Sequence, residues 1–140
     1  MTEIKYARGE DRDFWFTLDK HLPAGEWRGK VSRRECYILT ENGTPSGILR
    51  YNLFWDNTPF CNLLYIDEPQ RGKGFGRLLM ECWEDDMKRL GYGLVMTSTQ
   101  SDESAQHFYR RLGYTDCGGF IIPVTGYEQP LEIIFVKGLH

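Results

Sequence analysis

The amino-acid sequence predicts an α/β (α+β) fold, with a mixed and mostly antiparallel central sheet of about seven strands flanked by about four helices. Short apolar runs of strand length alternate with helical patterns through the centre of the chain, which is typical of a sheet covered by helices. An Asn-Gly pair joins two of the early runs, and this pair is a strong signal for a β-hairpin. A length of 140 residues suits one domain with its own hydrophobic core, so we expect a single domain over residues 1–140.

The first half of the chain predicts four strands and one or two helices. The expected elements are a strand at residues 2–7, helices within residues 11–34 that break at Leu22-Pro23-Ala24-Gly25, and strands at residues 36–40, 47–54 and 60–66. Asn42-Gly43 supplies the hairpin turn that follows residues 36–40.

The second half predicts two helices and three strands. A long amphipathic helix is expected at residues 74–90, with an apolar face made of Phe75, Leu78, Leu79, Cys82, Trp83, Met87 and Leu90. After a strand at residues 93–98, a second helix is expected to begin at Ser101 as its N-cap, with Asp102 in its first turn and Gly113 just past its end. Strands at residues 115–122 and 131–136 complete the expected sheet.

Composition and charge exclude several classes of protein. The net charge of −3 gives no electrostatic reason to expect a nucleic-acid partner. The four cysteines show no Cys-x-x-Cys spacing, so neither a disulfide framework nor a metal site is indicated. The longest apolar runs are too short to span a bilayer, and the first residues lack the apolar segment of a signal peptide. We therefore expect a cytoplasmic protein that binds no metal, nucleic acid or membrane.

The most informative segment leads from the strand at residues 60–66 into the long helix. It contains three alternate glycines, Gly72, Gly74 and Gly76, with basic residues interspersed. Glycines at a helix N-terminus leave backbone N–H groups facing outward, and the helix dipole favours an anion there. The spacing fits neither a Walker loop nor a dinucleotide-binding fingerprint, although the segment alone is also compatible with a turn that binds nothing.

Two motifs carry a resemblance to a known family. Arg71-Gly72-Lys73-Gly74-Phe75-Gly76 fits the pattern R/Q-x-x-G-x-G/A. About thirty residues later, the segment from Asp102 to Tyr114 resembles the pattern N-x-x-A-x-x-F-Y-x-x-L-G-F/Y, with Asp102 in place of the usual Asn. Together the motifs resemble the GNAT superfamily of acetyl-coenzyme A-dependent N-acetyltransferases. Asp102 lacks the amide N–H with which that Asn would contact the cofactor.

The resemblance implies an acyltransferase, with acetyl-CoA as the acyl donor. In this family the strands at residues 60–66 and 93–98 run side by side and splay apart at their C-terminal ends. The residues implied in cofactor binding are Leu64, Tyr65 and Ile66 beside the pantetheine arm, the backbone of Arg71, Gly72, Lys73, Gly74, Phe75, Gly76 and Arg77 around the pyrophosphate, and Asp102.

The implied reaction transfers an acetyl group to a primary amine of a small molecule, peptide or protein, by direct attack in a ternary complex. An alkyl amine with a pKa near ~10.4 is about one part in 10³ neutral at pH 7, so the reaction needs a general base or a desolvated pocket. Residues 61–66 contain no carboxylate, and the sequence assigns no base. The resemblance implies Tyr109 as the acid that protonates the leaving thiolate.

The acceptor pocket is expected in the variable segments. Its candidate lining residues are Tyr51, Trp55, Asp56, Tyr127 and Glu128, because aromatic rings beside carboxylates suit a cationic amine. Ordinary packing or surface roles remain an open interpretation of these residues. A non-catalytic coenzyme A-binding regulatory module is the alternative function, and a homodimer is one expectation for the assembly.

Overall fold

The computed structural model describes residues 1–140 and contains seven strands in one sheet, in the order β1-β2-β3-β4-β5-β7-β6. The strands are β1 Thr2–Tyr6, β2 Cys36–Glu41, β3 Thr44–Phe54, β4 Thr58–Ile66, β5 Leu94–Gln100, β6 Thr115–Phe120 and β7 Glu132–Gly138. The pairs β1–β2, β2–β3, β5–β7 and β6–β7 are antiparallel, whereas β4 and β5 are parallel. The expected mixed and mostly antiparallel sheet is confirmed.

Four α-helices accompany the sheet, as expected: α1 Arg12–Leu18, α2 Trp27–Ser32, α3 Phe75–Arg89 and α4 Ala105–Arg111. Short 3-10 turns occur at Gly9–Asp11, Ala24–Glu26 and Glu68–Gln70. The expected interruption between the first two helices is present, since neither helix includes residues 22–25. None of the helices combines the length and hydrophobicity needed to cross a bilayer.

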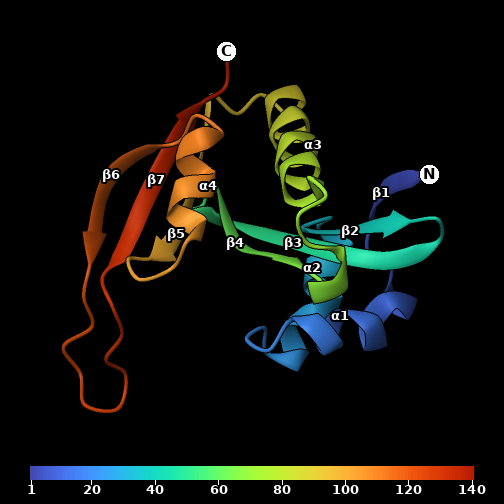
Figure 1. Cartoon of the computed structure of the whole chain (residues 1–140), viewed down its shortest axis with the longest axis horizontal. Coiled ribbons are helices and arrows are strands. Elements are labelled where there is room, and N and C mark those ends of the chain that lie inside the picture. Colours follow the sequence, from blue (N-terminus) through green and yellow to red (C-terminus); the bar gives the residue numbers. More distant parts are fainter. The chain divides into compact units, whose positions relative to one another are not determined.

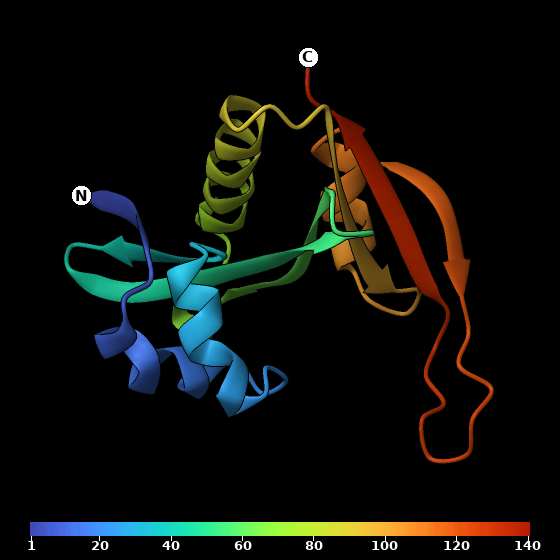
Figure 2. The ribbon, with the colours of Figure 1, turned by 180° about the vertical axis from the view of Figure 1, so that it is seen from behind.

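The chain forms two compact units. Unit 1 comprises residues 1–52 and 62–86, and unit 2 comprises residues 53–61 and 87–140. In unit 1, α1 and α2 lie against one face of the β2–β3 hairpin and α3 lies on its other face (Figures 1 and 2). The hairpin turns through Asn42 and Gly43, whose φ angles of 52° and 81° are the left-handed conformation that this turn requires.

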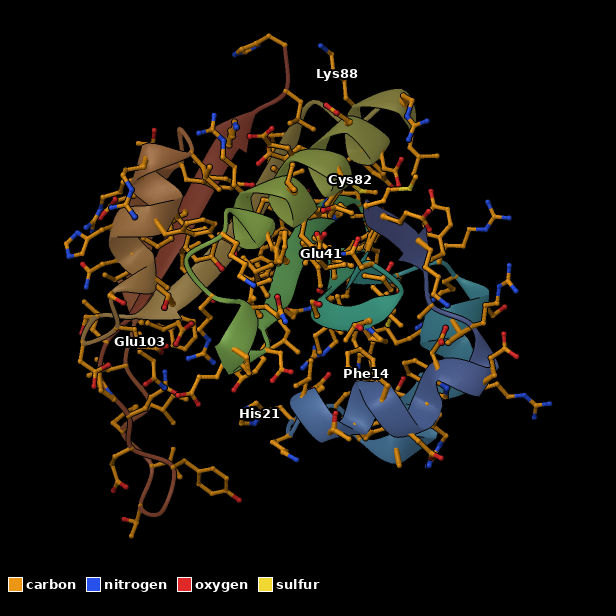
Figure 3. All side chains as sticks on the ribbon, turned by 45° about the vertical axis from the view of Figure 1, so that its right-hand side comes forward. Phe14, His21, Glu41, Cys82, Lys88 and Glu103 are labelled. Carbon is orange, nitrogen blue, oxygen red and sulfur yellow. The ribbon has the colours of Figure 1, made fainter.

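The face of unit 1 that α1 and α2 cover carries an apolar cluster of Ala7, Trp15, Leu22, Trp27, Cys36, Ile38 and Ile48. Phe14 of α1 packs against this cluster, and Figure 3 labels it on that helix. The ring centroids of Trp15 and Trp27 lie 5.3 Å apart. Beside the rings, the buried Asp19 carboxylate accepts hydrogen bonds from Arg50 Nε at 2.7 Å and Trp15 Nε1 at 3.0 Å. This pairing satisfies a charge that would otherwise be costly to bury.

The buried face of α3 in unit 1 includes Phe75, Leu79, Met80 and Trp83. Two residues of the expected apolar face, Leu78 and Leu90, are instead exposed. Leu78 is turned about 100° around the helix from Leu79, and Leu90 lies beyond the last helical residue. The carboxylate of Asp86 also lies on the buried side, where it accepts hydrogen bonds from Tyr6 Oη at 2.7 Å and Tyr37 Oη at 2.8 Å.

In unit 2, β7 pairs with β5 along one side and with β6 along the other, and α4 lies over β5 and β7 (Figure 1). The expected start of this helix at Ser101 is wrong, since α4 begins at Ala105. Gln106 Nε2 donates to the backbone oxygens of Ser101 at 2.8 Å and Glu103 at 2.9 Å, and these bonds hold the preceding residues in a turn. The end at Gly113 is confirmed, because Gly113 has a φ of 96° and its N–H bonds to Arg110 O. The strand β6 ends at Phe120 rather than residue 122, and β7 begins at Glu132 rather than residue 131.

Because two tyrosine hydroxyls donate to the Asp86 carboxylate, its removal is expected to lower the free energy of unfolding substantially. Asp86→Ala leaves two partly or fully buried donors without this acceptor, and we expect a loss of about 2–5 kcal/mol in the free energy of unfolding. Urea denaturation of both proteins measures the difference. Asp85→Ala removes a carboxylate from the exposed side of the same helix and is expected to change stability by less than about 0.5 kcal/mol. Equal effects of the two substitutions would contradict this account of α3.

Candidate functional site

The segment that follows β4 in unit 1 is shaped by its own backbone bonds. The Asp67 N–H donates to Ser46 O at 2.9 Å, which joins the start of the segment to β3. Its carboxylate accepts from the Glu68 N–H at 3.1 Å, and its carbonyl accepts from the Gln70 N–H at 2.8 Å. Asp67 therefore caps a tight 3-10 turn that redirects the chain from β4 toward α3.

Two glycines in the left-handed conformation complete the approach to α3. Gly72 has a φ of 79° and Gly74 a φ of 82°, and apart from its own residue and chain neighbours no heavy atom lies within 4 Å of the place where a Cβ would stand on either. Glycine is therefore needed here for the backbone angle rather than for lack of space. The first intrahelical bond runs from the Leu78 N–H to Gly74 O at 3.2 Å. The N–H groups of residues 75–77 precede it and have no acceptor within the helix, so they can bind an anion.

Three basic side chains accompany these N–H groups. Arg71 Nε donates to Ile66 O at 2.9 Å, and its guanidinium lies 5.1 Å from the centre of the Tyr65 ring. Lys73 Nζ donates to Gln70, and Arg77 forms an ion pair with Glu81. The cationic side chains thus lie along the same short segment as the amides, which increases the attraction for an anion.

Inside unit 1, the end of β4 and the start of α3 both lie close to Gly47 of β3. A Cβ added at Gly47 of β3 would lie 2.7 Å from Ile66 Cδ1, 3.2 Å from Leu79 Cδ1 and 3.4 Å from Tyr65 O. A side chain at position 47 would therefore require the terminal methyl groups of Ile66 and Leu79 to shift, while the Tyr65 carbonyl oxygen lies at an ordinary contact distance. Gly47 therefore helps to position the residues on both sides of the glycine segment.

Tyr109, on α4 in unit 2, is only 6% exposed. Its ring lies 5.8 Å from the ring centres of both Tyr114 and Phe135. Burial raises the pKa of the phenol, and Cys61 and Glu103 add to the increase, while the nearby Thr97 hydroxyl opposes it. Figure 3 labels Glu103 at the turn that leads into α4. The structure thus holds the Tyr109 side chain inside unit 2.

The other residues named from the sequence occupy varied positions. Asp102 is exposed in the turn before α4, so it is not in the first turn of the helix. Tyr51 is a core residue of unit 1, with its ring 5.8 Å from that of Trp83, which does not favour its expected place in an acceptor pocket. Trp55, at the β3–β4 turn, is 78% exposed, and Tyr127, in the β6–β7 loop, is 71% exposed.

The two remaining acceptor candidates are held by local backbone geometry. Asp56 follows Trp55 with a φ of 62°, and its N–H donates to Leu53 O at 3.3 Å. Glu128 Oε2 accepts from the Gly126 N–H at 2.9 Å. The chain contains no cluster of three or more His, Cys, Asp or Glu side chains arranged to hold a metal ion.

Sequence reasoning missed two residues, Gly47 and Thr97. A glycine within a strand is a known sign of a close backbone approach, which could have drawn attention to Gly47. Thr97 lies in a Thr-Ser-Thr run whose alternation marks one buried side of β5, but nothing in the run indicates that its hydroxyl affects the pKa of Tyr109.

Comparison with known proteins identifies the family. A family model described as "Acetyltransferase (GNAT) family" matches residues 4–114. The chain belongs to the GNAT acetyltransferase family. The resemblance drawn from the two motifs and the expectation of an acyltransferase are confirmed at the level of the family. A comparison with curated proteins gave no match.

Solved structures support the fold of this family member. Ard1 from Thermoplasma volcanium has a TM-score of 0.83 at 14% identity, covering 99% of this chain and 98% of that one. The yncA protein of Salmonella typhimurium, solved with its cofactor acetyl-CoA, has a TM-score of 0.82 at 16% identity, with coverages of 100% and 95%. Arabidopsis thaliana Naa50, in complex with the bisubstrate analogue CoA-Ac-MVNAL, has a TM-score of 0.80 at 14% identity, with 97% of each chain covered. At these identities the likeness shows the fold alone.

The contact at Gly47 predicts that an added methyl group is destabilising. Gly47→Ala places a Cβ against Ile66 and Leu79, and we expect a loss of about 1–3 kcal/mol in unfolding free energy from overpacking. Denaturant titration measures it. Gly93→Ala serves as the control, because nothing lies within 4 Å of a Cβ at that position. A Gly47→Ala protein as stable as the control would show that the approach of Ile66 is not tight.

Proposed function

We propose that this GNAT family member is an acetyl-CoA-dependent N-acetyltransferase, and that residues 1–140 form one N-acetyltransferase domain. It would transfer an acetyl group from coenzyme A to a primary amine by direct attack in a ternary complex. The observation that carries the proposal is the pair of left-handed glycines ahead of α3, with the helix N–H groups of residues 75–77 left without helical acceptors. The cytoplasmic location and the homodimer expected from the sequence stay predictions.

The residues present fit the phosphate-rich end of coenzyme A. The backbone from Arg71 to Arg77 would bind the pyrophosphate, with the cationic side chains of that segment around it. A helix N-terminus contributes about 0.3–2 kcal/mol toward an anion, whereas micromolar affinity requires about −8 kcal/mol. Further hydrogen bonds must supply the difference, and the end of β4 at Leu64, Tyr65 and Ile66 is the proposed partner of the pantetheine arm. An arm that pairs with Ile66 O would share that oxygen with Arg71 Nε or replace it there.

When bound, acetyl-CoA supplies an acetyl group as a thioester that a neutral amine can attack. The chain's contribution is to bind the donor and to provide a proton for the leaving sulfur. Tyr109 is the proposed acid, because its raised pKa keeps the phenol protonated at neutral pH. In the transfer the amine nitrogen would form a bond to the acetyl carbon as the carbon–sulfur bond breaks. Tyr109 would give its proton to the leaving sulfur, and a proton from water would then restore the phenol. The amine loses its own proton through water, since no base is assigned.

The proposed acceptor is a small-molecule, peptide or protein amine. Naa50 is named in complex with an analogue that joins CoA to the peptide MVNAL, so a peptide N-terminus is a reasonable first acceptor to test. Trp55 and Tyr127 remain candidate contacts because their rings are exposed, and Asp56 and Glu128 lie beside them in the sequence. Mass spectrometry of a panel of amines and peptides incubated with acetyl-CoA tests the acceptor class directly.

A non-catalytic coenzyme A-binding module is the second candidate. Residues 61–66 are the strand positions that could supply a general base, and they contain no carboxylate. This absence favours the non-catalytic module. Release of free thiol from acetyl-CoA that depends on added amine would exclude the module. Binding of coenzyme A without such release would support it.

The glycine conformation predicts a specific loss of cofactor binding. Gly74→Ala forces a Cβ onto a residue with a φ of 82°, which introduces a strain of about 1–2 kcal/mol. Because relief of this strain would reshape the segment, we expect about a tenfold or larger increase in the Kd for coenzyme A. Isothermal titration calorimetry measures it. Gly43→Ala introduces the same strain at a φ of 81° in the β2–β3 turn and is expected to lower stability while leaving the Kd unchanged. Unaltered binding by Gly74→Ala would remove this segment from the proposed cofactor contacts.

The role of Tyr109 predicts a separation of binding from turnover. Tyr109→Phe keeps the ring between Tyr114 and Phe135 but removes the proton donor, and we expect kcat to fall by about 10²–10⁴-fold with little change in the Kd for coenzyme A. Steady-state assays and calorimetry on the same preparation measure the two quantities. A variant with wild-type kcat would exclude Tyr109 as the acid.

A further inference from the structure

The carboxylate of Asp19, which follows α1 in unit 1, is fully buried and fully hydrogen-bonded. Its Oδ1 accepts from the backbone N–H of His21, a residue labelled in Figure 3, at 3.0 Å and from that of Leu22 at 3.1 Å. Its Oδ2 accepts from Trp15 Nε1 at 3.0 Å and from Arg50 Nε at 2.7 Å. A carboxylate offers about four lone-pair sites, so Asp19 has no capacity left for a further donor.

Arg50 of β3 uses only one of the five N–H donors of its guanidinium in this bond. Its side chain is 11% exposed. The remaining N–H groups, on Nη1 and Nη2, have no acceptor in the chain. Since Trp83 Nε1 is the only fully buried polar side-chain atom without a hydrogen-bond partner, both Nη atoms are accessible from outside the protein. The guanidinium therefore presents a fixed fork of donors to the outside.

Balancing the charge of Asp19 does not by itself require an arginine. Burial alone would raise the pKa of Asp19, but the bonds from Arg50, His21 and Leu22 outweigh it and hold the pKa below its usual value. A lysine at position 50 can provide the single charged bond that this ionised carboxylate accepts. Arginine adds the planar pair of Nη groups, whose spacing matches two oxygens of a carboxylate or phosphate.

A second buried ion pair lies close to the fork without supplying an acceptor for it. Lys30 Nζ donates to Glu35 Oε1 at 3.0 Å and to the backbone oxygen of Tyr51, the residue after Arg50, at 2.6 Å. Arg33 Nε donates to the same Glu35 oxygen at 3.0 Å. Glu35 is thus already bound by two cations, and the acceptor for the Arg50 fork is water or another molecule.

The fork also lies near the strand that is proposed to bind the pantetheine arm. Arg50 and Asn52 are two residues apart on β3, so their side chains leave the same face of the strand about 7 Å apart. Asn52 Oδ1 accepts from Asn62 Nδ2 of β4 at 2.8 Å. Asn62 comes two residues before Leu64, the first residue proposed to contact the arm. Only a few strand residues therefore separate the fork from the proposed position of the arm.

We propose that Arg50 is a specificity-determining residue, whose Nη groups bind an oxoanion, a carboxylate or a phosphate, carried by the amine acceptor. This inference rests on the proposed function and names the class of its acceptor. Asp19 holds the guanidinium in place before the acceptor arrives, so little side-chain freedom is lost on binding. Two parallel N–H···O bonds fix the orientation of the acceptor as well as its position.

The first test observes the fork without any turnover. In the ¹⁵N-labelled full-length chain, the Arg50 Nε–H signal is assigned by its loss in Arg50→Lys, which keeps a cation beside Asp19. At constant ionic strength, we expect 4-aminobutyrate or 3-aminopropylphosphonate to shift this signal saturably, whereas butylamine leaves it in place. The first probe reports on a carboxylate and the second on a phosphate-like anion. A signal that neither anion moves, or that butylamine moves equally, would overturn the proposal.

The second test measures acetyl transfer to 4-aminobutyrate and to 4-aminobutyramide, which differ in the charge of one terminal group. We expect the wild-type protein to favour the acid about ten- to a hundredfold in kcat/KM, the range for a hydrogen bond to a charged group. In Arg50→Lys most of this preference should disappear through a higher KM for the acid, with KM for acetyl-CoA within about twofold of wild type. Arg33→Lys makes the same replacement at a side chain that is 55% exposed and should keep the preference.

The outcomes separate this inference from the proposed function. Equal use of the acid and the amide by the wild-type protein, or an unchanged preference in Arg50→Lys, would overturn the role of Arg50 alone. A shifted Arg50 signal in a protein that acetylates no amine would instead overturn the proposed function and leave the oxoanion site standing.

Discussion

The structure depends on how the backbone turns from β4 into α3. A helix that begins after two left-handed glycines presents N–H groups that its own carbonyls cannot reach. Such groups require water or an anion, and the preceding strand and turn determine the direction in which they point. Asp67 caps the turn, and Gly47 lets the end of β4 lie close to β3. The conformation of a few residues thus leaves N–H groups open to an anion, and the rest of unit 1 holds those residues in position.

In unit 2, the burial of Tyr109 changes the pKa of its phenol. Tyr109 is surrounded by aromatic rings that exclude water, which makes its proton hard to remove. The same surroundings strengthen any hydrogen bond made to its oxygen. The nearby Thr97 hydroxyl on β5 opposes part of the increase in the pKa of the phenol. A buried tyrosine can then serve both as a packed core residue and as a proton donor, and these two interpretations of Tyr109 are compatible.

Local signals predicted much of this architecture. The Asn42-Gly43 turn, the break before α2 and the glycine past the end of α4 were all correctly placed, because each depends on backbone preferences within a few residues. The start of α4 was placed wrongly at Ser101. A serine followed by acidic residues is a good capping pattern, but Gln106 holds those residues in a turn instead. Leu78 was assigned to the wrong side of α3 because its apolar character does not reveal which side the sheet covers.

The sequence by itself determined the order of the elements, the two motifs and hence the family, because these features reside in neighbouring residues. Only the tertiary structure brought Thr97 to Tyr109, Asp86 to two tyrosines and Gly47 to Ile66. Each of these contacts joins residues of different strands and helices. Such a contact depends on strand register and on which helix side is buried, and the packing of the whole sheet, rather than any local preference, decides both.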